Sequence, residues 1–372
     1  MSLNTPPISA GRALEVLHAG WQAQADGRLT ASWMLHGRPG VGKSQIVQQL
    51  ADVIGAKLFD LRLTTIEPQD LRGLPYYDHD QRKTVWYRPE DLPDDPQAPA
   101  ILFLDELTAA SPYLQPTVYG LLQERRVGQH LLPDSVLIVA AGNTVEDGAI
   151  AYEMGTALSD RLIHLHVQAD PKDWLETYAA LKGLSPAVTA FLRSRPDLLE
   201  TTEESLRRGH LITCTPRAWE RVSEIMSAVP DRATRQTLIA GTVGDAAAAE
   251  FAVIADEIQA SVQINDILQA TEKERFSLFP ESLHGMNAVV FGLVGAANPH
   301  TLSEIIDIME QIRHVARHRD TPAFAQLPLA ELSAFGFEML MAKAFRDGLQ
   351  DAFTGSAAYA RYAADRQALG LD

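Results

Sequence analysis

The sequence has only one cysteine, Cys214, among its 372 residues. One thiol can form neither an intramolecular disulfide nor a zinc site built from several cysteines. A long apolar run is missing as well: the longest, residues 286–297, contains Asn287 and two glycines and is shorter than the about 20 residues of a membrane-spanning helix. No basic stretch followed by an apolar core stands at the N-terminus, so no signal peptide is predicted. We expect a soluble, cytoplasmic protein with no membrane partner.

Positive charge is also in short supply. The chain has 32 lysines and arginines and 48 acidic residues, which gives a net charge of −16. Binding to nucleic acid rests largely on contacts of Lys and Arg with phosphates, so the composition disfavours DNA and RNA as partners. The hydrophobic share of 46% is that of an ordinary globular protein and excludes a wholly disordered chain.

The first half of the chain predicts a parallel α/β fold. Short apolar runs alternate with helical stretches, and such runs are typical of strands buried on both faces of a parallel sheet. Helical patterns cover residues 9–27 and 43–54. Five strands are expected, at residues 32–36, 57–63, 100–105, 136–141 and 162–167.

The pattern changes after residue 169, where helical stretches follow one another and no further strand stands out. Cys214 lies in this half and is expected to be a small buried side chain. We divide the chain into an N-terminal helix and linker, an α/β core, an all-α region and a helical C-terminal extension. The expected bounds are residues 1–30, 31–170, 171–260 and 261–372.

A phosphate-binding pattern, G-x-x-x-x-G-K-[ST], stands at residues 37–44 between a predicted strand and a predicted helix. Glycines let backbone N–H groups converge on phosphate oxygens. Lys43 places a positive charge against the β- and γ-phosphates, Ser44 offers a hydroxyl to Mg²⁺, and the helix directs its positive end at the nucleotide. ATP and Mg²⁺ are therefore the predicted ligands. The expected nucleotide-binding residues are Gly37, Arg38, Pro39, Gly40, Val41, Gly42, Lys43, Ser44 and Gln45.

The strand at residues 100–105 ends in two carboxylates, Asp105 and Glu106. Enzymes with a phosphate loop need an acid here to help hold Mg²⁺, and Asp105 together with Ser44 is the candidate. Hydrolysis also needs a group that orients or deprotonates the attacking water, and Glu106 fits that role. A small-molecule kinase has no need of this second acid, because it should exclude water. The pair therefore favours ATP hydrolysis.

The order of these motifs and the next ones resembles that of AAA+ ATPases. The phosphate loop and the Asp-Glu strand are followed by an apolar strand ending at Asn143, by Asp160-Arg161 and by Pro216-Arg217. More narrowly, residues 30–260 resemble the MoxR family with its CbbQ/NorQ-like members. The motifs that support this narrower resemblance are Glu67-Pro-Gln-Asp-Leu-Arg-Gly73, residues 114–126 (LQPTVYGLLQERR) and Thr215-Pro-Arg-Ala-Trp219.

The resemblance implies catalytic roles for three residues in addition to Glu106. Asn143 resembles sensor 1, which positions the attacking water; alternatively, it only caps its strand. Arg161 resembles the arginine finger, which reaches the γ-phosphate of a neighbouring subunit; it could instead pair with an acid of its own subunit. Arg125 and Arg126 are rival fingers. Arg217 resembles sensor 2, which contacts phosphate from the all-α lid, unless it is simply an exposed arginine at a helix start.

The segment 64–88, between the second predicted strand and the strand that ends at Asp105, is too long for a simple helical connection. The segments 74–77 and 84–87 predict a hairpin, which resembles the insert that MoxR-like proteins carry in their second helix. A second hairpin is expected at about residues 125–137. The first one carries Tyr76, Tyr77, Trp86 and Tyr87, which either grip a partner protein or pack as local core. Since neighbours on a strand point to opposite faces, only one of Trp86 and Tyr87 can face a partner.

The MoxR resemblance implies a homo-oligomer, expected to be a hexameric ring, that acts as a chaperone on a protein client. A metalloenzyme or a protein with a von Willebrand factor A domain is the implied partner. The residues alone indicate only Mg-ATP hydrolysis coupled to motion between domains. The alternative is a nucleic-acid-remodelling AAA+ motor, which Arg125, Arg126 and His130 favour and the net charge opposes. A small-molecule kinase and a nucleotide-gated scaffold without turnover are the remaining alternatives.

Overall fold

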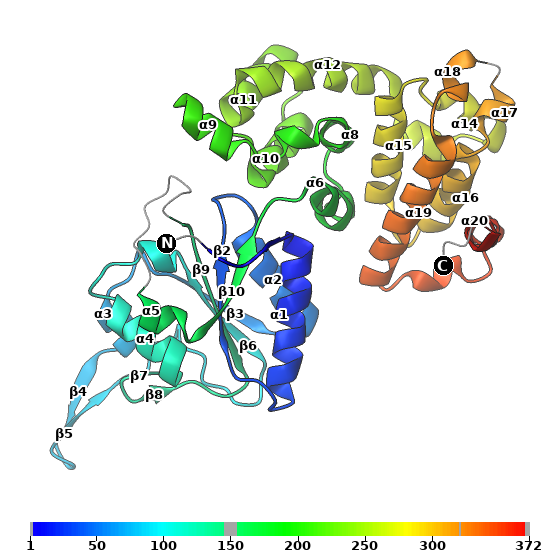
Figure 1. Cartoon of the computed structure of the whole chain (residues 1–372). Coiled ribbons are helices and arrows are strands. Elements are labelled where there is room, and N and C mark those ends of the chain that lie inside the picture. Colours follow the sequence, from blue (N-terminus) through cyan, green and yellow to red (C-terminus); the bar gives the residue numbers. More distant parts are fainter. Residues whose placement is uncertain (1–2, 145–154, 320, 369–372) are drawn as a thin grey trace. The chain divides into compact units, whose positions relative to one another are not determined.

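The computed structural model describes residues 3–144, 155–319 and 321–368 (Figure 1). The chain forms two compact units, Met1–Asp170 and Pro171–Asp372. The division falls where the strand pattern of the sequence ends, and residues 171–260 and 261–372 lie together in the second unit. Within the described ranges, no helix is both long and apolar enough to cross a membrane.

A parallel sheet forms the centre of the first unit, in the order β1-β10-β2-β9-β6-β3. β9 is buried along its whole length and pairs with β2 on one side and β6 on the other, as expected of an interior strand in a parallel sheet. The predicted parallel α/β core is confirmed. The strands are β1 (Pro7–Ile8), β2 (Ser32–His36), β3 (Lys57–Arg62), β6 (Ala100–Asp105), β9 (Val136–Gly142) and β10 (Leu162–Val167).

Helices cover both faces of this sheet, because alternate side chains of a strand point to opposite sides. In β6, Ile101 and Phe103 join the apolar cluster of α1 and α2, whereas Leu102 and Leu104 join the cluster of α4. The helices of the first unit are α1 (Ala10–Ala25), α2 (Lys43–Ile54), α3 (Pro68–Arg72), α4 (Gln115–Glu124) and α5 (Thr156–Ser159), with a 3₁₀ turn at Leu107–Ala109.

Among the residues that the structure describes, the sheet has six strands, and the predicted number of five is wrong by one. The additional strand, β1, consists of Pro7 and Ile8, which pair in parallel with His166 and Val167 of β10. Two residues are too few to show a strand pattern, and a proline fits only where its missing N–H is not needed, as at a sheet edge. The segment before α1 therefore belongs to the sheet and is not only a linker.

Two antiparallel hairpins branch from the first unit. In the arm, defined as residues 74–87, β4 (Pro75–Asp78) pairs with β5 (Lys83–Trp86), and it projects away from the sheet (Figure 1). The second hairpin pairs β7 (Arg126–Val127) with β8 (His130–Leu131). It is shorter than expected, because β9 already begins at residue 136.

Every regular element in the described part of the second unit is a helix. Its apolar interior includes α15, which is buried from Gly285 to Leu293 and beyond and packs against α8 and α19. Trp219 of α10 lies fully buried between Phe191 and Phe251, with ring centroids 5.2 and 5.7 Å away. The helices are α6 (Pro171–Asp173), continued by a π-helical turn (Trp174–Ala179) into α7 (Ala180–Lys182), then α8 (Pro186–Ser194), α9 (Thr202–Arg208), α10 (Pro216–Ala228), α11 (Arg232–Val243), α12 (Asp245–Ser261), α13 (Ile264–Gln269), α14 (Glu272–Leu278), α15 (Leu283–Ala296), α16 (Leu302–Ile312), α17 (Val315–His318), α18 (Pro322–Ala325), α19 (Leu329–Arg346) and α20 (Ala357–Ala368), with 3₁₀ turns at Pro196–Leu198 and Gln350–Phe353.

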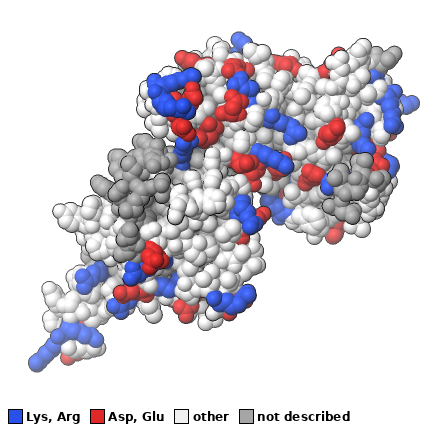
Figure 2. Space-filling view, viewed as in Figure 1, with Lys and Arg blue, Asp and Glu red and all other residues white. Residues whose placement is uncertain are grey.

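Charged side chains are unevenly distributed over the surface. Figure 2 shows basic side chains at the outer end of the arm, where the sequence places Arg82 and Lys83. Acidic and basic side chains are interspersed over the rest of the face in view. The arm as a whole has no net charge, because Asp78 and Asp80 precede Arg82 and Lys83 in its turn, whereas the whole chain carries a net charge of −16.

Candidate active site

The phosphate loop connects the end of β2 to the beginning of α2. Gly40 and Gly42 have φ angles of 82° and 105°, a left-handed region that glycine enters far more readily than other residues. Gly37 lies so close to β10 that a Cβ there would meet Val167 O at 2.4 Å. The glycines of the motif therefore shape the loop. Arg38, Pro39 and Val41 lie in the loop and Gln45 in the first turn of α2; that they bind the nucleotide stays a prediction.

Lys43 and Asn143 meet at this loop. Lys43 Nζ donates hydrogen bonds to Gly37 O, to Arg38 O at 3.1 Å and to Asn143 Oδ1 at 2.9 Å. Asn143 follows β9, whose last residue pairs with His36 at the end of β2. Neighbouring parallel strands thus bring together two side chains that lie 100 residues apart.

Ser44 and Asp105 form the second contact of the site. Ser44 Oγ donates to Asp105 Oδ2 at 3.3 Å, and Asp105 Oδ1 accepts from Glu106 N at 2.9 Å. A hydroxyl and a carboxylate are the oxygen ligands that Mg²⁺ prefers, so these two residues fit the predicted metal. When bound with ATP, Mg²⁺ neutralises part of the phosphate charge. Burial, and then the charge of Asp105, also raise the pKa of Asp60 on the neighbouring strand β3.

Glu106 lies beside the metal ligands in an unusual backbone conformation. Its φ of 60° is left-handed although it is not a glycine, and such strain is often found at active sites. Thr64, just after β3, donates its hydroxyl to Glu106 Oε2 at 2.5 Å. The carboxylate is therefore held at the carboxyl edge of the sheet, on the side of the phosphate loop.

Two threonines of the site escaped sequence reasoning. Thr64 holds Glu106, and Thr108 accepts a hydrogen bond from Asn143 N at 3.1 Å. A Cβ at Gly142 would meet Thr108 Oγ1 at 2.6 Å, so the glycine permits this close approach. The only available signal was position, because both threonines follow predicted strands whose carboxyl ends share one edge of the sheet.

Arg161 lies away from the phosphate loop of its own chain. It is exposed in the turn between α5 and β10, and its N donates to Leu158 O at 3.1 Å. The next residue, Leu162, pairs with Ser32 at the beginning of β2, whereas the loop follows the end of β2. The distance along the strand is about 15 Å at the usual rise per residue. Arg161 therefore lies at the end of the sheet where its parallel strands begin, whereas Lys43 lies at the end where they finish.

The rival fingers already have partners within the first unit. The Arg125 guanidinium donates to Pro133 O at 2.9 Å and to Val136 O at 2.6 Å, and burial lowers its pKa. Arg126 Nε pairs with Glu124 at 2.8 Å on the surface. Arg125 is thus used to hold the second hairpin.

Arg217 belongs to the second unit and is exposed in the first turn of α10. Thr215 caps this helix by accepting from Ala218 N at 3.1 Å. The contact of Arg217 with phosphate stays a prediction. Cys214, two residues before the helix, is buried as expected, and its Sγ donates to Val243 O at 3.4 Å.

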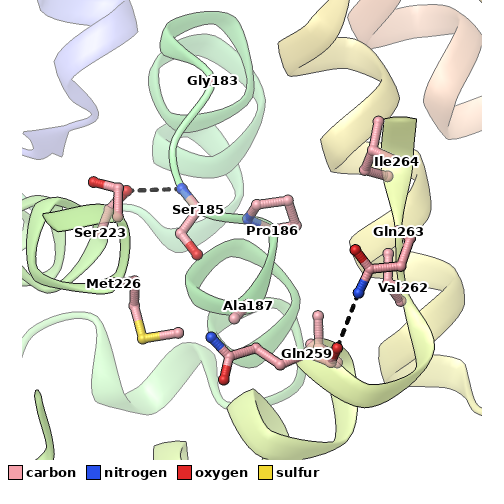
Figure 3. A pocket seen from close by; sticks show the side chains of 12 residues that line it. Gly183, Ser185, Pro186, Ala187, Ser223, Met226, Gln259, Val262, Gln263 and Ile264 are labelled. Atoms are coloured by element: carbon pink, nitrogen blue, oxygen red, sulfur yellow. Dashed lines mark hydrogen bonds between the residues drawn. The ribbon is translucent and has the colours of Figure 1, made fainter. Parts of the chain in front are cut away.

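A groove in the second unit has the wrong chemistry for a triphosphate (Figure 3). It has a volume of about 580 Å³ and lies between the beginning of α8 and the ends of α10 and α12. Ser185 N donates to Ser223 Oγ at 2.7 Å on one side, and Gln263 Nε2 donates to Gln259 O at 3.1 Å on the other. All the residues that line it are uncharged. The phosphate loop therefore remains the candidate active site.

Fold and site together define the first unit as an ATP-hydrolysing domain of the phosphate-loop class. It is an AAA+ core of parallel strands, and the helical second unit follows it along the chain. Residues 32–162 match the family model of the AAA domain, dynein-related subfamily. The matched segment runs from the first residue of β2 to the first of β10, so it contains the phosphate loop, both acidic residues and Asn143. The chain thus carries the ATPase domain that the motifs predicted.

A comparison with curated proteins finds no match. Among solved structures, the chain is similar to a RuvB mutant of Thermotoga maritima, with 12% identity over 92% of this chain and 88% of that chain and a TM-score of 0.39. It is also similar to a candidate ATPase from Cytophaga hutchinsonii, with 15% identity over 92% and 86% of the two chains and a TM-score of 0.33. At such identities and TM-scores, neither likeness says what this chain acts on.

Proposed function

We propose that this chain is a MoxR-like ATPase that assembles into a ring, with six copies expected, and uses ATP hydrolysis to remodel a protein partner. The observation that carries the proposal is the position of Arg161, at the opposite edge of the sheet from the loop that contains Lys43. An arginine in this place serves a phosphate site best when that site belongs to another copy. Each active site would then be complete only at the junction of two subunits.

Residues of two neighbouring copies contribute to hydrolysis at each site. Lys43 and the loop N–H groups bind the phosphates, and Ser44 with Asp105 would hold Mg²⁺. Glu106 orients the water and accepts its proton, while Asn143, bonded to Lys43, helps to position the water beside the γ-phosphate. Arg161 of the next copy stabilises the charge of the transition state.

The arm is the proposed contact with the partner protein. Tyr77 is 73% exposed, and Tyr87 is exposed and stacks on Tyr76 with ring centroids 4.7 Å apart. Trp86 turns the other way and lies under the Arg72 guanidinium at 4.2 Å. The arm therefore offers tyrosines, which are good anchors in protein interfaces, and keeps its tryptophan for packing. A metalloenzyme or a protein with a von Willebrand factor A domain is the proposed partner.

The second hairpin offers little support for the alternative of a nucleic-acid motor. Arg125 is bonded to backbone carbonyls, and Arg126 is paired with Glu124. His130 is buried, and its Nε2 bonds to Arg72 O at 3.1 Å. Arg125 and His130 are thus engaged within the protein, where phosphates of DNA or RNA compete poorly for them, and only Arg126 lies on the surface in an exposed pair.

Mixed assemblies test whether Arg161 acts between copies. Arg161→Ala should lose most ATP turnover, and so should Lys43→Ala. A mixture of the two variants should regain part of the activity, because some junctions then combine an intact Lys43 with an intact Arg161. Arg28→Ala, which removes another exposed arginine of the first unit, is the matched control and should keep full turnover. No regain in the mixture would contradict action between copies.

Partner capture tests the proposed role of the arm. Glu106→Gln should hold ATP without hydrolysis and retain the partner in a pull-down. Adding Tyr77→Ser or Tyr87→Ser should release the partner and leave ATP binding unchanged. Tyr113→Ser is the matched control, since Tyr113 is 84% exposed and lies outside the arm. Recovery of nucleic acid in place of protein would support the motor, and unchanged capture by both arm variants would remove the arm from partner binding.

A further inference from the structure

Two imidazoles link the phosphate loop to the strand that follows Arg161. His36, the last residue of β2, is buried and directly precedes Gly37. Its ring stacks on that of His164 in β10 with centroids 5.1 Å apart, and His36 Nε2 lies 2.8 Å from His164 Nδ1. Neither residue belongs to the phosphate-binding motif or to the groups that would touch ATP, so hydrolysis as described above leaves this pair without a role.

His164 in turn holds the turn that carries Arg161. Its Nε2 lies 2.9 Å from Ser159 O and 3.1 Å from Ser159 Oγ. Ser159 is the last residue of α5, and Asp160 and Arg161 follow it. Arg161 N also donates to the carbonyl of Leu158, whose side chain is buried in the core. The turn is thus fastened both to the core and to His164.

The hydrogen-bond partners assign the protons of the pair. Ser159 O can only accept, so His164 Nε2 carries the hydrogen of that bond. A neutral His164 then has its lone pair on Nδ1, and His36 Nε2 donates to it. Burial, together with the nearby His164, His166 and Lys43, lowers the pKa of His36 to about 3. His36 is therefore neutral at ordinary pH. The bond from His36 Nε2 to His164 Nδ1 and the bond from His164 Nε2 to Ser159 O can then be formed together.

We propose that His164, supported by His36, is a positioning residue that sets the Arg161 turn for catalysis in the neighbouring copy. The inference rests on the proposed action of Arg161 between copies. It adds a route by which the state of one phosphate loop reaches the next active site: Gly37, which accepts from Lys43, is bonded in sequence to His36, and His36 contacts His164. An arginine displaced by about 1 Å can lose on the order of 100-fold in rate, so such fastening matters.

The first measurement is steady-state ATP hydrolysis by three variants. His164→Phe keeps a ring but removes both hydrogen bonds, and kcat should fall about tenfold or more while KM for ATP stays within about threefold. His164→Gln keeps a donor and an acceptor and should retain most of kcat. His300→Phe makes the same replacement at an exposed histidine between α15 and α16, outside the first unit, and should behave like the natural protein. Should phenylalanine not fit, His164→Leu supplies the same measurement with a smaller side chain.

The second measurement locates the defect. In mixtures with Lys43→Ala, His164→Phe should regain activity, because its intact loop can be served by the well-placed Arg161 of the Lys43→Ala copy. If Arg161→Ala regains activity in such mixtures and His164→Phe does not, His164 acts on its own loop and the positioning role is wrong. If Arg161→Ala itself shows no regain, the proposed action between copies fails and the inference falls with it. A normal kcat for His164→Phe also overturns it.

Discussion

Replacing Glu106 by glutamine separates ATP binding from ATP hydrolysis. The amide has almost the shape of the carboxylate, and its oxygen can still accept from Thr64, which now bonds to Glu106 Oε2 at 2.5 Å. The backbone bond from residue 106 N to Asp105 Oδ1 at 2.9 Å is untouched. Glutamate and glutamine bear the same strain at a φ of 60°. The folded structure and the nucleotide site should therefore survive the change.

The expected loss lies in the chemical step. A positioned general base contributes on the order of 100- to 10,000-fold to a rate, which corresponds to about 3–5 kcal/mol of transition-state stabilisation. An amide cannot accept the proton of water, so kcat should fall by that factor. The free energy of unfolding should change by less than about 0.5 kcal/mol, as for a substitution that leaves packing and hydrogen bonds in place.

Two assays measure the effect on turnover and the effect on ATP binding separately. Phosphate release measures kcat, and titration with a fluorescent ATP analogue measures the dissociation constant. Glu124→Gln is the matched control, because Glu124 is exposed and pairs only on the surface with Arg126 at 2.8 Å, a contact of little energetic weight. A kcat within about threefold of the natural protein for Glu106→Gln would falsify the assignment of Glu106 as the base.

Three further outcomes are expected. Lys43→Ala removes a charge-assisted contact with phosphate and should weaken ATP binding about 10- to 100-fold, measured by calorimetry; unchanged affinity would contradict the role of the loop. Gly37→Ala places a Cβ 2.4 Å from Val167 O and should lower stability by about 1–3 kcal/mol, seen in thermal unfolding; an unchanged midpoint would show that the loop yields at no cost. Burial raises the pKa of Cys214 to about 11, so the thiol stays protonated at pH 8 and iodoacetamide should modify it only after unfolding; rapid modification of the folded protein would refute its burial.

Much of the core could be predicted from the sequence, because burial leaves a pattern. β2, β6 and β10 have the predicted bounds, and so does α2. Their apolar runs are long enough to show that both faces of the sheet are covered. The phosphate loop is equally readable, since each fixed position of its motif has a separate physical requirement. The two-residue strand β1 was not, because pairing at an edge needs neither length nor a hydrophobic pattern.

Contacts between distant segments account for most of what sequence reasoning missed. Thr64 is ordinary in its own surroundings and becomes a partner of Glu106 only because β3 pairs with β6. His36 and His164 meet because β2 lies beside β10. Helix ends depend on local backbone geometry: α19 ends at Arg346, and Gly348 follows with a left-handed φ of 71°.

The buried Cys214 makes this chain a convenient carrier for spectroscopic labels. It is the only cysteine in the sequence, and its thiol is inaccessible in the folded protein. A cysteine introduced at Arg82, in the turn of the arm, would then react alone, without removal of the native residue. A dye attached there would report whether the surroundings of the arm change when ATP is bound or hydrolysed.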